Sequence, residues 1–201
     1  MAVWGRTSIL PIDLAGLVRR RKPEQRTDQL APRDVSELVS VDAFAAQPGR
    51  PILAPDTTVY IHQAAGRLPA SARRLVEGAL MFHCSVCLAE LASGLAHADV
   101  SSPRWSDSRD HFDAVFSRIP DTRLLVPDRD VWIDAGLIAG ALARTQGFRR
   151  EDQKECLNDA LIYLTAAKAG LPVLTENRGQ FDLIQQLAPE GRFIHYSASA
   201  S

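Results

Sequence analysis

The chain has 201 residues, of which 46% are hydrophobic and 23% are charged, and its formal net charge is −1. This composition predicts a soluble globular protein with one sizeable core, and the charge argues against binding nucleic acid by bulk electrostatics. No apolar stretch approaches the ~20 residues of a membrane-spanning helix, and the early charges follow the apolar part, the reverse of a secretory signal. We therefore expect a cytoplasmic protein without a membrane segment, and three cysteines, an odd number, fit a reducing compartment.

The first 50 residues differ in composition from the rest of the chain. Their prolines are Pro11, Pro23, Pro32 and Pro48. Because the apolar stretches between these prolines are short, residues 1–50 are predicted to form an N-terminal arm with one or two short helices. The basic run at 19–22 has two interpretations. It is a solvated helix end stabilised by the helix dipole, or it faces RNA or a protein partner.

From residue 51 onward, short apolar strands alternate with amphipathic helices. The predicted strands are residues 51–55, 80–84, 122–127, 171–175 and 192–196. The predicted helices are residues 57–65, 70–79, 86–94, 103–119, 129–146, 159–169 and 178–188, with a charged loop at 148–155. Strands separated by helices predict an α/β fold with a mainly parallel central sheet and helices on both faces. We expect residues 51–201 to form this domain.

Capping residues set several of these helix limits. Ser85, Asp128 and Asn158 are suited to begin helices, because their side chains accept hydrogen bonds from free backbone N–H groups. Three glycines are suited to end helices, namely Gly94, Gly147 and Gly170.

Three acidic residues lie where apolar elements begin or end. Asp56 follows the first strand, Glu90 lies in the helix after the second, and Asp159 opens the helix before strand 171–175. A carboxylate among apolar residues is costly unless a partner or a cation offsets its charge. Sites in open parallel sheets collect at the carboxyl ends of strands, so the three acids are predicted to form a divalent-metal site. Alone, Asp56 also suits a helix cap, and Asp159 suits a first-turn acid stabilised by the helix dipole.

Three blocks of sequence resemble the PIN-domain nucleases, and most of all the VapC-type toxins of bacterial toxin–antitoxin pairs. The blocks begin at Asp56-Thr57-Thr58, at Ser85-Val86 and at Asn158-Asp159, and the last runs on to Thr175 and Asn177. The resemblance covers roughly residues 52–196 in the right order and spacing. It implies a PIN-like three-layer α/β/α fold with a mainly parallel central sheet, to which the N-terminal arm is added.

The resemblance also implies an activity. In such proteins the acids matching Asp56, Glu90 and Asp159 gather Mg²⁺ or Mn²⁺ for metal-dependent hydrolysis of RNA phosphodiester bonds. Thr175 and Asn177 match the small polar residues that line this site. A VapC-like toxin would form a homodimer and bind a cognate antitoxin protein that controls it.

One position departs from the family pattern. The family commonly has a fourth acid before a Phe, and this chain has Gln180 before Phe181. Glu176 and Asp182 lie nearby in sequence and are candidates to compensate. The alternative is a non-catalytic PIN-like module with a degraded metal site, which binds RNA or protein through the arm.

Several arginines are candidates for contacts with RNA phosphates, with solvated surface as the competing interpretation. They are Arg67, Arg73, Arg74, Arg149, Arg150 and Arg178.

Overall fold

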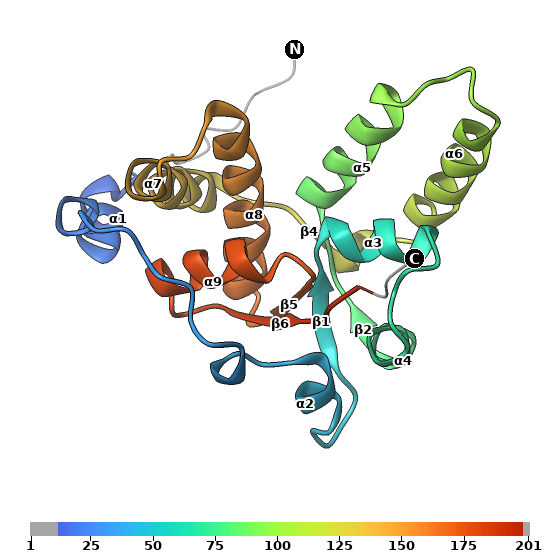
Figure 1. Ribbon diagram of the computed structural model, residues 1–201, viewed down its shortest axis with the longest axis horizontal. Coiled ribbons are helices and arrows are strands. Elements are labelled where there is room, and N and C mark those ends of the chain that lie inside the picture. The colour runs from blue at the N-terminus through green and yellow to red at the C-terminus, as the bar shows by residue number, and fades with distance from the viewer. Residues whose placement is uncertain (1–11, 199–201) are drawn as a thin grey trace, which may run out of the picture.

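The computed structural model describes residues 12–198, and its centre is a parallel β-sheet (Figure 1). Four strands pair in the order β2-β1-β5-β6. They are β1 (Ile52–Pro55), β2 (Leu80–Met81), β5 (Pro172–Thr175) and β6 (Arg192–His195). A second parallel pair joins β3 (His83–Cys84) to β4 (Leu124–Leu125). Only Phe82 separates β2 from β3, so the predicted strand at 80–84 is present but interrupted at that residue.

The larger helices of the body follow the predicted order. They are α3 (Thr57–Ala64), α4 (Ala70–Gly78), α5 (Ser85–His97), α6 (Pro103–Phe116), α7 (Arg129–Gln146), α8 (Arg150–Lys168) and α9 (Arg178–Leu187). The predicted caps of α7 hold, since the Asp128 side chain accepts from the backbone of Val131 and Gly147 adopts a left-handed conformation. A short 3-10 turn, η3 (Asp121–Arg123), precedes β4.

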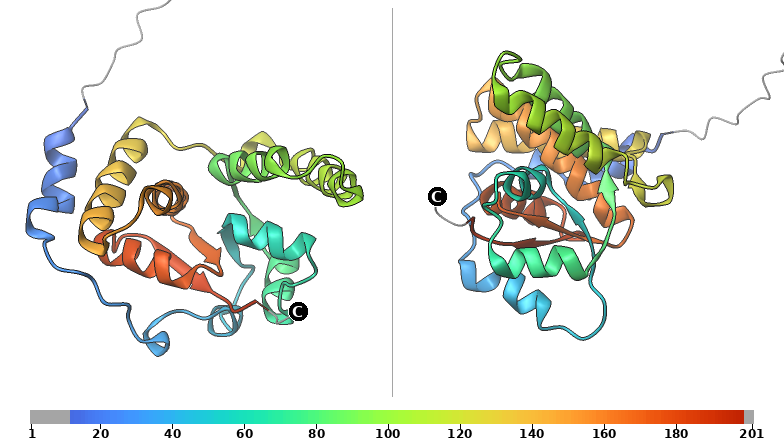
Figure 2. Two further views of the ribbon diagram at one scale, coloured as in Figure 1. Left: turned by 45° about the horizontal axis from the view of Figure 1, so that its top comes forward. Right: turned by 90° about the vertical axis from the view of Figure 1, so that its right-hand side faces the viewer.

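Successive side chains of a strand point to opposite faces of a sheet, and both faces of this sheet carry apolar side chains. Helices cover both faces. One apolar cluster contains Ala54, Val173 and Phe193 together with residues of α5, α7, α8 and α9. The other contains the neighbouring strand residues and side chains of α3, α4 and α2 (Val41–Ala45). Figure 2 shows the same arrangement from two further directions. The predicted three-layer α/β/α fold with a parallel central sheet is therefore confirmed.

The charged segment at 148–155 was the main error in the predicted elements. It is the first part of α8, which begins at Arg150, and Asn158 lies inside the helix and does not cap it. The Asp152 side chain accepts a hydrogen bond from the Arg149 backbone N–H at 3.1 Å, and two acids occupy the first turn, where the helix dipole favours them. A polar sequence with this capping chemistry forms a solvated helix end.

Helix α5 also differs from its predicted limits. Cys84 is the N-cap, Ser85 is the first helical residue, and the helix runs through Gly94 to His97. Gly94 has an ordinary helical conformation with open space beside its Cα, so it interrupts nothing. Beyond it, the Trp105 indole N–H of α6 donates to the Leu95 carbonyl at 3.0 Å and ties α5 to α6.

The described part of the arm lies against the body of the protein. It contains α1 (Leu14–Arg21), η1 (Pro23–Gln25), η2 (Val35–Glu37) and α2. In Figure 2 it passes from α1 along the outside of α9 towards the sheet. The His195 backbone N–H of β6 donates to the Val39 carbonyl at 3.0 Å, and Ser40 forms a parallel bridge with His195. The arm thus pairs with the edge of the sheet.

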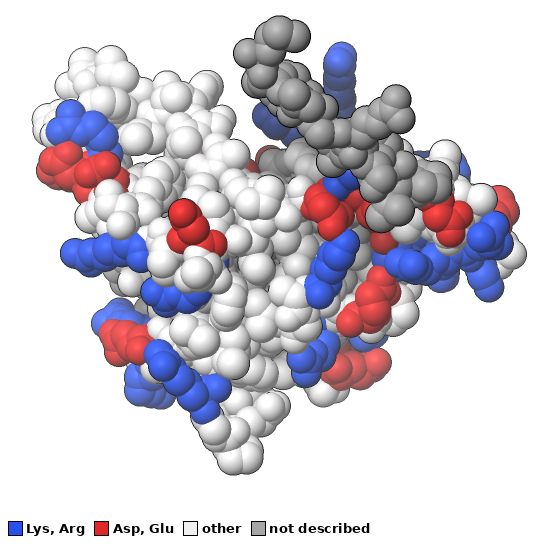
Figure 3. All heavy atoms as spheres, turned by 180° about the vertical axis from the view of Figure 1, so that it is seen from behind, with Lys and Arg blue, Asp and Glu red and all other residues white. Residues whose placement is uncertain are grey.

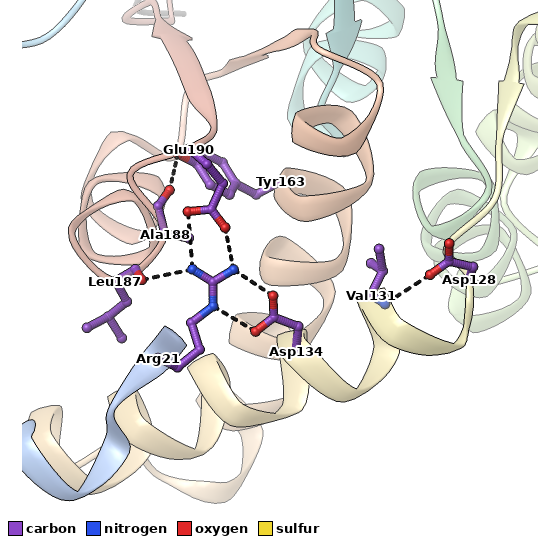
Figure 4. A network of polar contacts seen from close by, with 8 residues as sticks. All are labelled: Arg21, Asp128, Val131, Asp134, Tyr163, Leu187, Ala188 and Glu190. Carbon is purple, nitrogen blue, oxygen red and sulfur yellow. Dashed lines mark hydrogen bonds and ion pairs between the residues drawn. The ribbon is translucent and has the colours of Figure 1, made fainter. Parts of the chain in front are cut away.

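Two arginines join the arm to helices far away in sequence. Arg21 is only 4% exposed and donates twice to Asp134 of α7, at 2.7 and 2.6 Å, as well as to Glu190 and to the Leu187 carbonyl (Figure 4). Arg33 donates through Nε to Asp182 of α9 at 2.6 Å. Arg19, Arg20 and Lys22 are exposed. The solvated interpretation of the basic run therefore fits these three residues and is wrong for Arg21.

None of the helices within residues 12–198 combines the length and apolar character that crossing a membrane requires. Residues 1–11 of the predicted arm and 199–201 of the predicted domain lie outside the described residues.

Candidate functional site

Asp56 lies at the carboxyl edge of the sheet, directly after β1. Its backbone N–H donates to the Leu174 carbonyl of β5 at 2.9 Å, and its side chain is only 2% exposed. One carboxylate oxygen accepts from the Thr57 N–H at 2.6 Å, and the other accepts from the hydroxyls of Thr58 at 2.9 Å and Thr175 at 2.8 Å. Asp56 therefore caps α3, as its interpretation as a helix cap expected, and also faces the end of β5.

Glu90 reaches the same edge from α5. The Thr57 hydroxyl donates to one of its carboxylate oxygens, and the Asn158 side-chain amide donates to the other at 2.7 Å. One of the two polar partners of Glu90 thus comes from α8, one residue before Asp159. Asn158 was predicted as a helix cap, and its contact with Glu90 was not predicted.

Asp159 lies in the middle of α8 and is 8% exposed. The first-turn interpretation is wrong for this residue, because α8 begins at Arg150. The Asn177 side-chain amide donates to Asp159 Oδ2 at 3.0 Å. This is the one hydrogen bond that the carboxylate accepts from side chains within residues 12–198.

Hydrogen bonds join the three carboxylates into one polar network. The Thr175 hydroxyl donates to Asp56 and accepts from the Asn177 backbone N–H at 2.9 Å, while the Asn177 amide holds Asp159. On the other side, Thr57 links Asp56 to Glu90. The structure therefore brings together all the site residues that the sequence singled out, which are Asp56, Glu90, Asp159, Thr175 and Asn177.

The electrostatics of this network disfavour three bare negative charges. Burial raises the pKa of Asp56, and the charge of Glu90 raises it further, while the hydrogen bonds from Thr175 and Thr58 act in the opposite direction. Burial raises the pKa of Asp159 well above its usual value, and the charges of Asp56 and Glu90 add to this rise. Within residues 12–198, no Lys or Arg forms an ion pair with any of the three acids.

This donor set suits a hard divalent cation, which prefers carboxylate and amide oxygens. In the described part of the chain, no three His, Cys, Asp or Glu side chains form a ready-made group around a single ion. A loosely gathered set of carboxylates is compatible with a divalent cation that keeps several of its waters.

The fourth position of the family pattern does not carry a compensating acid. The Gln180 side-chain amide donates to the Cys156 sulfur at 3.0 Å, which places it against α8. Asp182 is 1% exposed and accepts from the side chain and backbone of Arg33, so its predicted compensating role is wrong. Glu176 is exposed and follows β5 directly.

A cavity of about 690 Å³ opens beside Glu90 and Asn158. Trp132, which is 50% exposed, lines it from α7, and Lys154 lines it from α8. Neither residue was singled out by the sequence, because an isolated Trp or Lys on an amphipathic helix carries no local signal of a site.

Comparisons with known proteins identify the family and the fold. A sequence model of the PIN domain matches residues 54–185. Among solved structures, the chain is similar to VapBC2 from Rickettsia felis, bound to a DNA fragment from its promoter, with 18% identity and a TM-score of 0.52 over 73% of this chain and 99% of that one. FitAcB from Neisseria gonorrhoeae gives 18% identity and a TM-score of 0.52 over 72% and 96% of the two chains.

VapBC-5 from Mycobacterium tuberculosis, a member of the VapBC family of toxin–antitoxin systems, gives 24% identity and a TM-score of 0.46 over 72% and 98% of the two chains. No curated protein sequence matches the chain. At such identities the structural likeness establishes the fold, whereas the sequence model spans more than half of the chain. The protein therefore belongs to the PIN domain family.

Proposed function

We propose that this protein is a metal-dependent endoribonuclease that hydrolyses RNA phosphodiester bonds. PIN domains are generally nucleases, and the chain belongs to that family. The observation that carries the proposal is the network of Asp56, Glu90 and Asp159, buried or half-buried at one sheet edge with no basic counter-ion in the described residues. Such a cluster is costly without a cation, and it offers the oxygen ligands that Mg²⁺ or Mn²⁺ takes.

In this proposal Asp56 and Asp159 hold the metal, and Glu90 ligates it or holds one of its waters. When bound, the cation lowers the pKa of a water and offsets negative charge on the phosphate. Thr175 and Asn177 orient the two aspartates through hydrogen bonds of 2.8 and 3.0 Å. Such supporting partners fix carboxylate geometry around a metal.

We further propose that the protein is the toxin of a toxin–antitoxin pair. Its sequence blocks resemble VapC-type toxins, and its structural neighbours include a VapBC assembly. In this role it acts in the cytoplasm, forms a homodimer and binds a cognate antitoxin.

Charged side chains do not form a broad basic surface on the face seen in Figure 3. Residues of both signs are spread around its rim, and its centre is largely uncharged. This distribution agrees with the net charge of −1. RNA would therefore be held by local contacts near the carboxylates, since bulk attraction is weak.

The alternative function is a non-catalytic RNA- or protein-binding module with a degraded metal site. The observation that favours it is Gln180, whose amide contacts Cys156 at the position where the family commonly has a fourth acid. A binding module gains nothing from the buried Asp56 and Asp159, whose charges oppose each other. The nuclease is therefore the better supported function.

Cleavage of a mixed structured RNA by the full chain tests the proposal, with Mg²⁺, with Mn²⁺ and with a chelator. We expect cleavage in either metal, none in chelator, and a loss of at least about a hundredfold in Asp56→Asn and Asp159→Asn, the upper end of what supporting partners of a metal site contribute. The matched control is Asp107→Asn, an exposed acid on α6. Equal cleavage in chelator, or full activity in both site variants, would rule out the metal-dependent nuclease.

A further inference from the structure

A second cavity lies at the carboxyl edge of the sheet, beyond the three acids. It has a volume of about 300 Å³, and its lining includes Glu176, Arg178, Gly179, His195 and Ser197. One wall is the first turn of α9, and the other is the end of β6. Its lining is thus mainly polar, and it is distinct from the cavity beside Trp132.

The sheet register places this cavity in line with the candidate metal site. Thr175 of β5 is paired with His195 of β6, and Leu174 is paired with Pro55, the residue before Asp56. Residues in register on neighbouring parallel strands point to the same face of a sheet. Asp56, Thr175 and His195 therefore form one row, with strands spaced about 4.8 Å apart.

His195 lines the cavity, and beneath the cavity surface it carries a polar atom without a hydrogen-bond partner. The residue is 8% exposed, and its Nε2 atom is buried without a hydrogen-bond partner within residues 12–198. Burial lowers the pKa of His195, and the charge of Arg178 lowers it further, so the neutral form of the ring is favoured. A neutral imidazole still has one N–H to donate, and a buried polar group without a partner is unfavourable. An anionic oxygen in the cavity would satisfy it once the ring turned towards the cavity.

The first turn of α9 supplies positive potential from the other side. Arg178 is exposed and forms no ion pair with the described residues, and the Gly179 backbone N–H has no intramolecular acceptor among them. A Cβ placed on Gly179 would meet no atom within 4 Å, so the space beside its Cα is open. Free N–H groups and the helix dipole favour anions at such an end.

We propose that this cavity binds a backbone phosphate of the RNA strand, adjacent to the phosphate at the three acids. The inference rests on the proposed function and names a subsite of it. Asn177 connects the two places, because its side-chain oxygen accepts from the Gln180 N–H at 3.4 Å in the first turn of α9 while its amide holds Asp159. An RNA backbone that follows the row of Asp56, Thr175 and His195 passes from one place to the other.

Glu176 allows a test in which removal of a charge should strengthen RNA binding, the opposite of the effect expected at Arg178. Its carboxylate lines the same cavity as Arg178, and both side chains are exposed, so neutral substitutions of either leave the core intact. If a phosphate is bound there, Arg178→Gln weakens binding and Glu176→Gln strengthens it. Arg192→Gln is the matched control for charge, because Arg192 lies on the same strand as His195 but at its opposite end.

The experiment measures binding of a short fluorescent single-stranded RNA to the full chain carrying Asp56→Asn, by anisotropy over a range of salt concentrations. We expect Arg178→Gln to weaken binding roughly tenfold and to reduce the salt slope by about 0.7, the contribution of one phosphate contact in a single strand. Glu176→Gln should bind more tightly, and Arg192→Gln should match its parent. His195→Phe should weaken binding without lowering the melting temperature.

Two results overturn the subsite. One is that Arg178→Gln and Glu176→Gln bind RNA as Arg192→Gln does, and the other is that no RNA binds at any salt concentration. A third contrary result is that inorganic phosphate binds in the cavity while Arg178→Gln leaves RNA binding unchanged. That result would identify a site for a small anion and not for RNA. If RNA binding depends on Arg178 but the original chain cleaves no RNA, the subsite is supported and the proposed nuclease function is contradicted. If the original chain cleaves RNA but Arg178→Gln binds RNA unchanged, the nuclease function is supported and the subsite is contradicted.

Discussion

At the scale of single residues, the polar partners decide how the acids are held. Thr57 and Asn158 hold Glu90, and Thr175 holds Asp56, all through side chains from different elements. These donors orient each carboxylate but leave its negative charge in place. The carboxylates are therefore held in position by side chains of the chain itself, and the mutual repulsion of their charges strains the site.

This strain predicts an unusual dependence of stability on pH in chelator. Because burial and neighbouring charges raise the pKa of Asp159 in the folded state, the folded chain binds more protons than the unfolded chain above the ordinary carboxyl pKa. The free energy of unfolding contributed by this group is therefore highest below that pKa and falls as pH rises through the folded-state pKa. Asp159→Asn should remove this fall and raise the melting temperature at neutral pH, by about 2–4 °C per kcal/mol of relieved strain.

Thermal melts of both chains in chelator between acidic and neutral pH measure this effect. Mg²⁺ should raise the melting temperature of the original chain more than that of Asp159→Asn. The exposed Asp107→Asn serves as the control and should follow the original chain. A variant that melts lower than the original chain at neutral pH would contradict the prediction.

Local patterns in the sequence carried much of this site but not its long-range partners. Asp56, Glu90 and Asp159 were found because charge stands out within apolar runs, and Thr175 and Asn177 followed from the family resemblance. The contacts of Asn158 and Thr57 depend on how α8 and α3 meet α5, which no local pattern specifies. For the same reason, the sequence did not predict that Trp132 and Lys154 line the neighbouring cavity.

At the scale of elements, a buried ion pair joins α1 to α7. Arg21 and Asp134 are separated by 113 positions, and both side chains are almost fully buried, at 3% and 7% exposure. Figure 4 shows the guanidinium between Asp134 and Glu190, with its third contact at the Leu187 carbonyl. Breaking such a pair leaves a buried charge without compensation.

Arg21→Ala should therefore reduce the free energy of unfolding by about 3–5 kcal/mol. Urea denaturation of the full chain measures this change, and Arg20→Ala, which removes an exposed neighbour of the same type, should alter stability by less than about 0.5 kcal/mol. The double change Arg21→Met with Asp134→Leu should recover most of the loss, because the one acidic partner of Arg21 that remains, Glu190, has a side chain that is 44% exposed. Equal effects of Arg20→Ala and Arg21→Ala would show that the ion pair contributes nothing.

Elements were predicted well where apolar period and caps agreed, as for α7 and β5. They were missed where polarity alone was taken as a sign of a loop, as for the start of α8. A solvated helix end and a charged loop have similar composition, and the distinction lies in the Arg149 and Asp152 capping pair. The burial of Arg21 could not be predicted from the sequence either, since its partner Asp134 lies on a helix that is distant in sequence.

At the scale of the whole molecule, the arm and the body share buried charge. Asp182 of α9 is 1% exposed and takes its only ion pair in the described residues from Arg33, and Asp134 of α7 takes its own from Arg21. A chain that begins at residue 51 would lose both arginines and leave two buried carboxylates unpaired. The division of the chain at residue 50, predicted from composition, is directly tested by such a truncation.

We expect the chain 51–201 to melt well below the full chain, with the loss of more than about 3 kcal/mol that one broken buried pair already entails. Circular dichroism melts of the two chains give the comparison. Asp182→Asn in the truncated chain should recover part of the loss, because an amide needs no counter-ion. A truncated chain that melts at the same temperature as the full chain would show that the body is stable alone.

The bridge between Ser40 and His195 also limits how copies of this protein can assemble. Unpaired N–H and C=O groups at a sheet edge invite strand addition from another chain. At β6 the His195 N–H is already bonded to Val39 of the same chain. Growth of the sheet is therefore blocked at the His195 end of β6, where the arm lies, and a second copy or a partner protein that approaches this end has to bind through side chains and not through main-chain pairing.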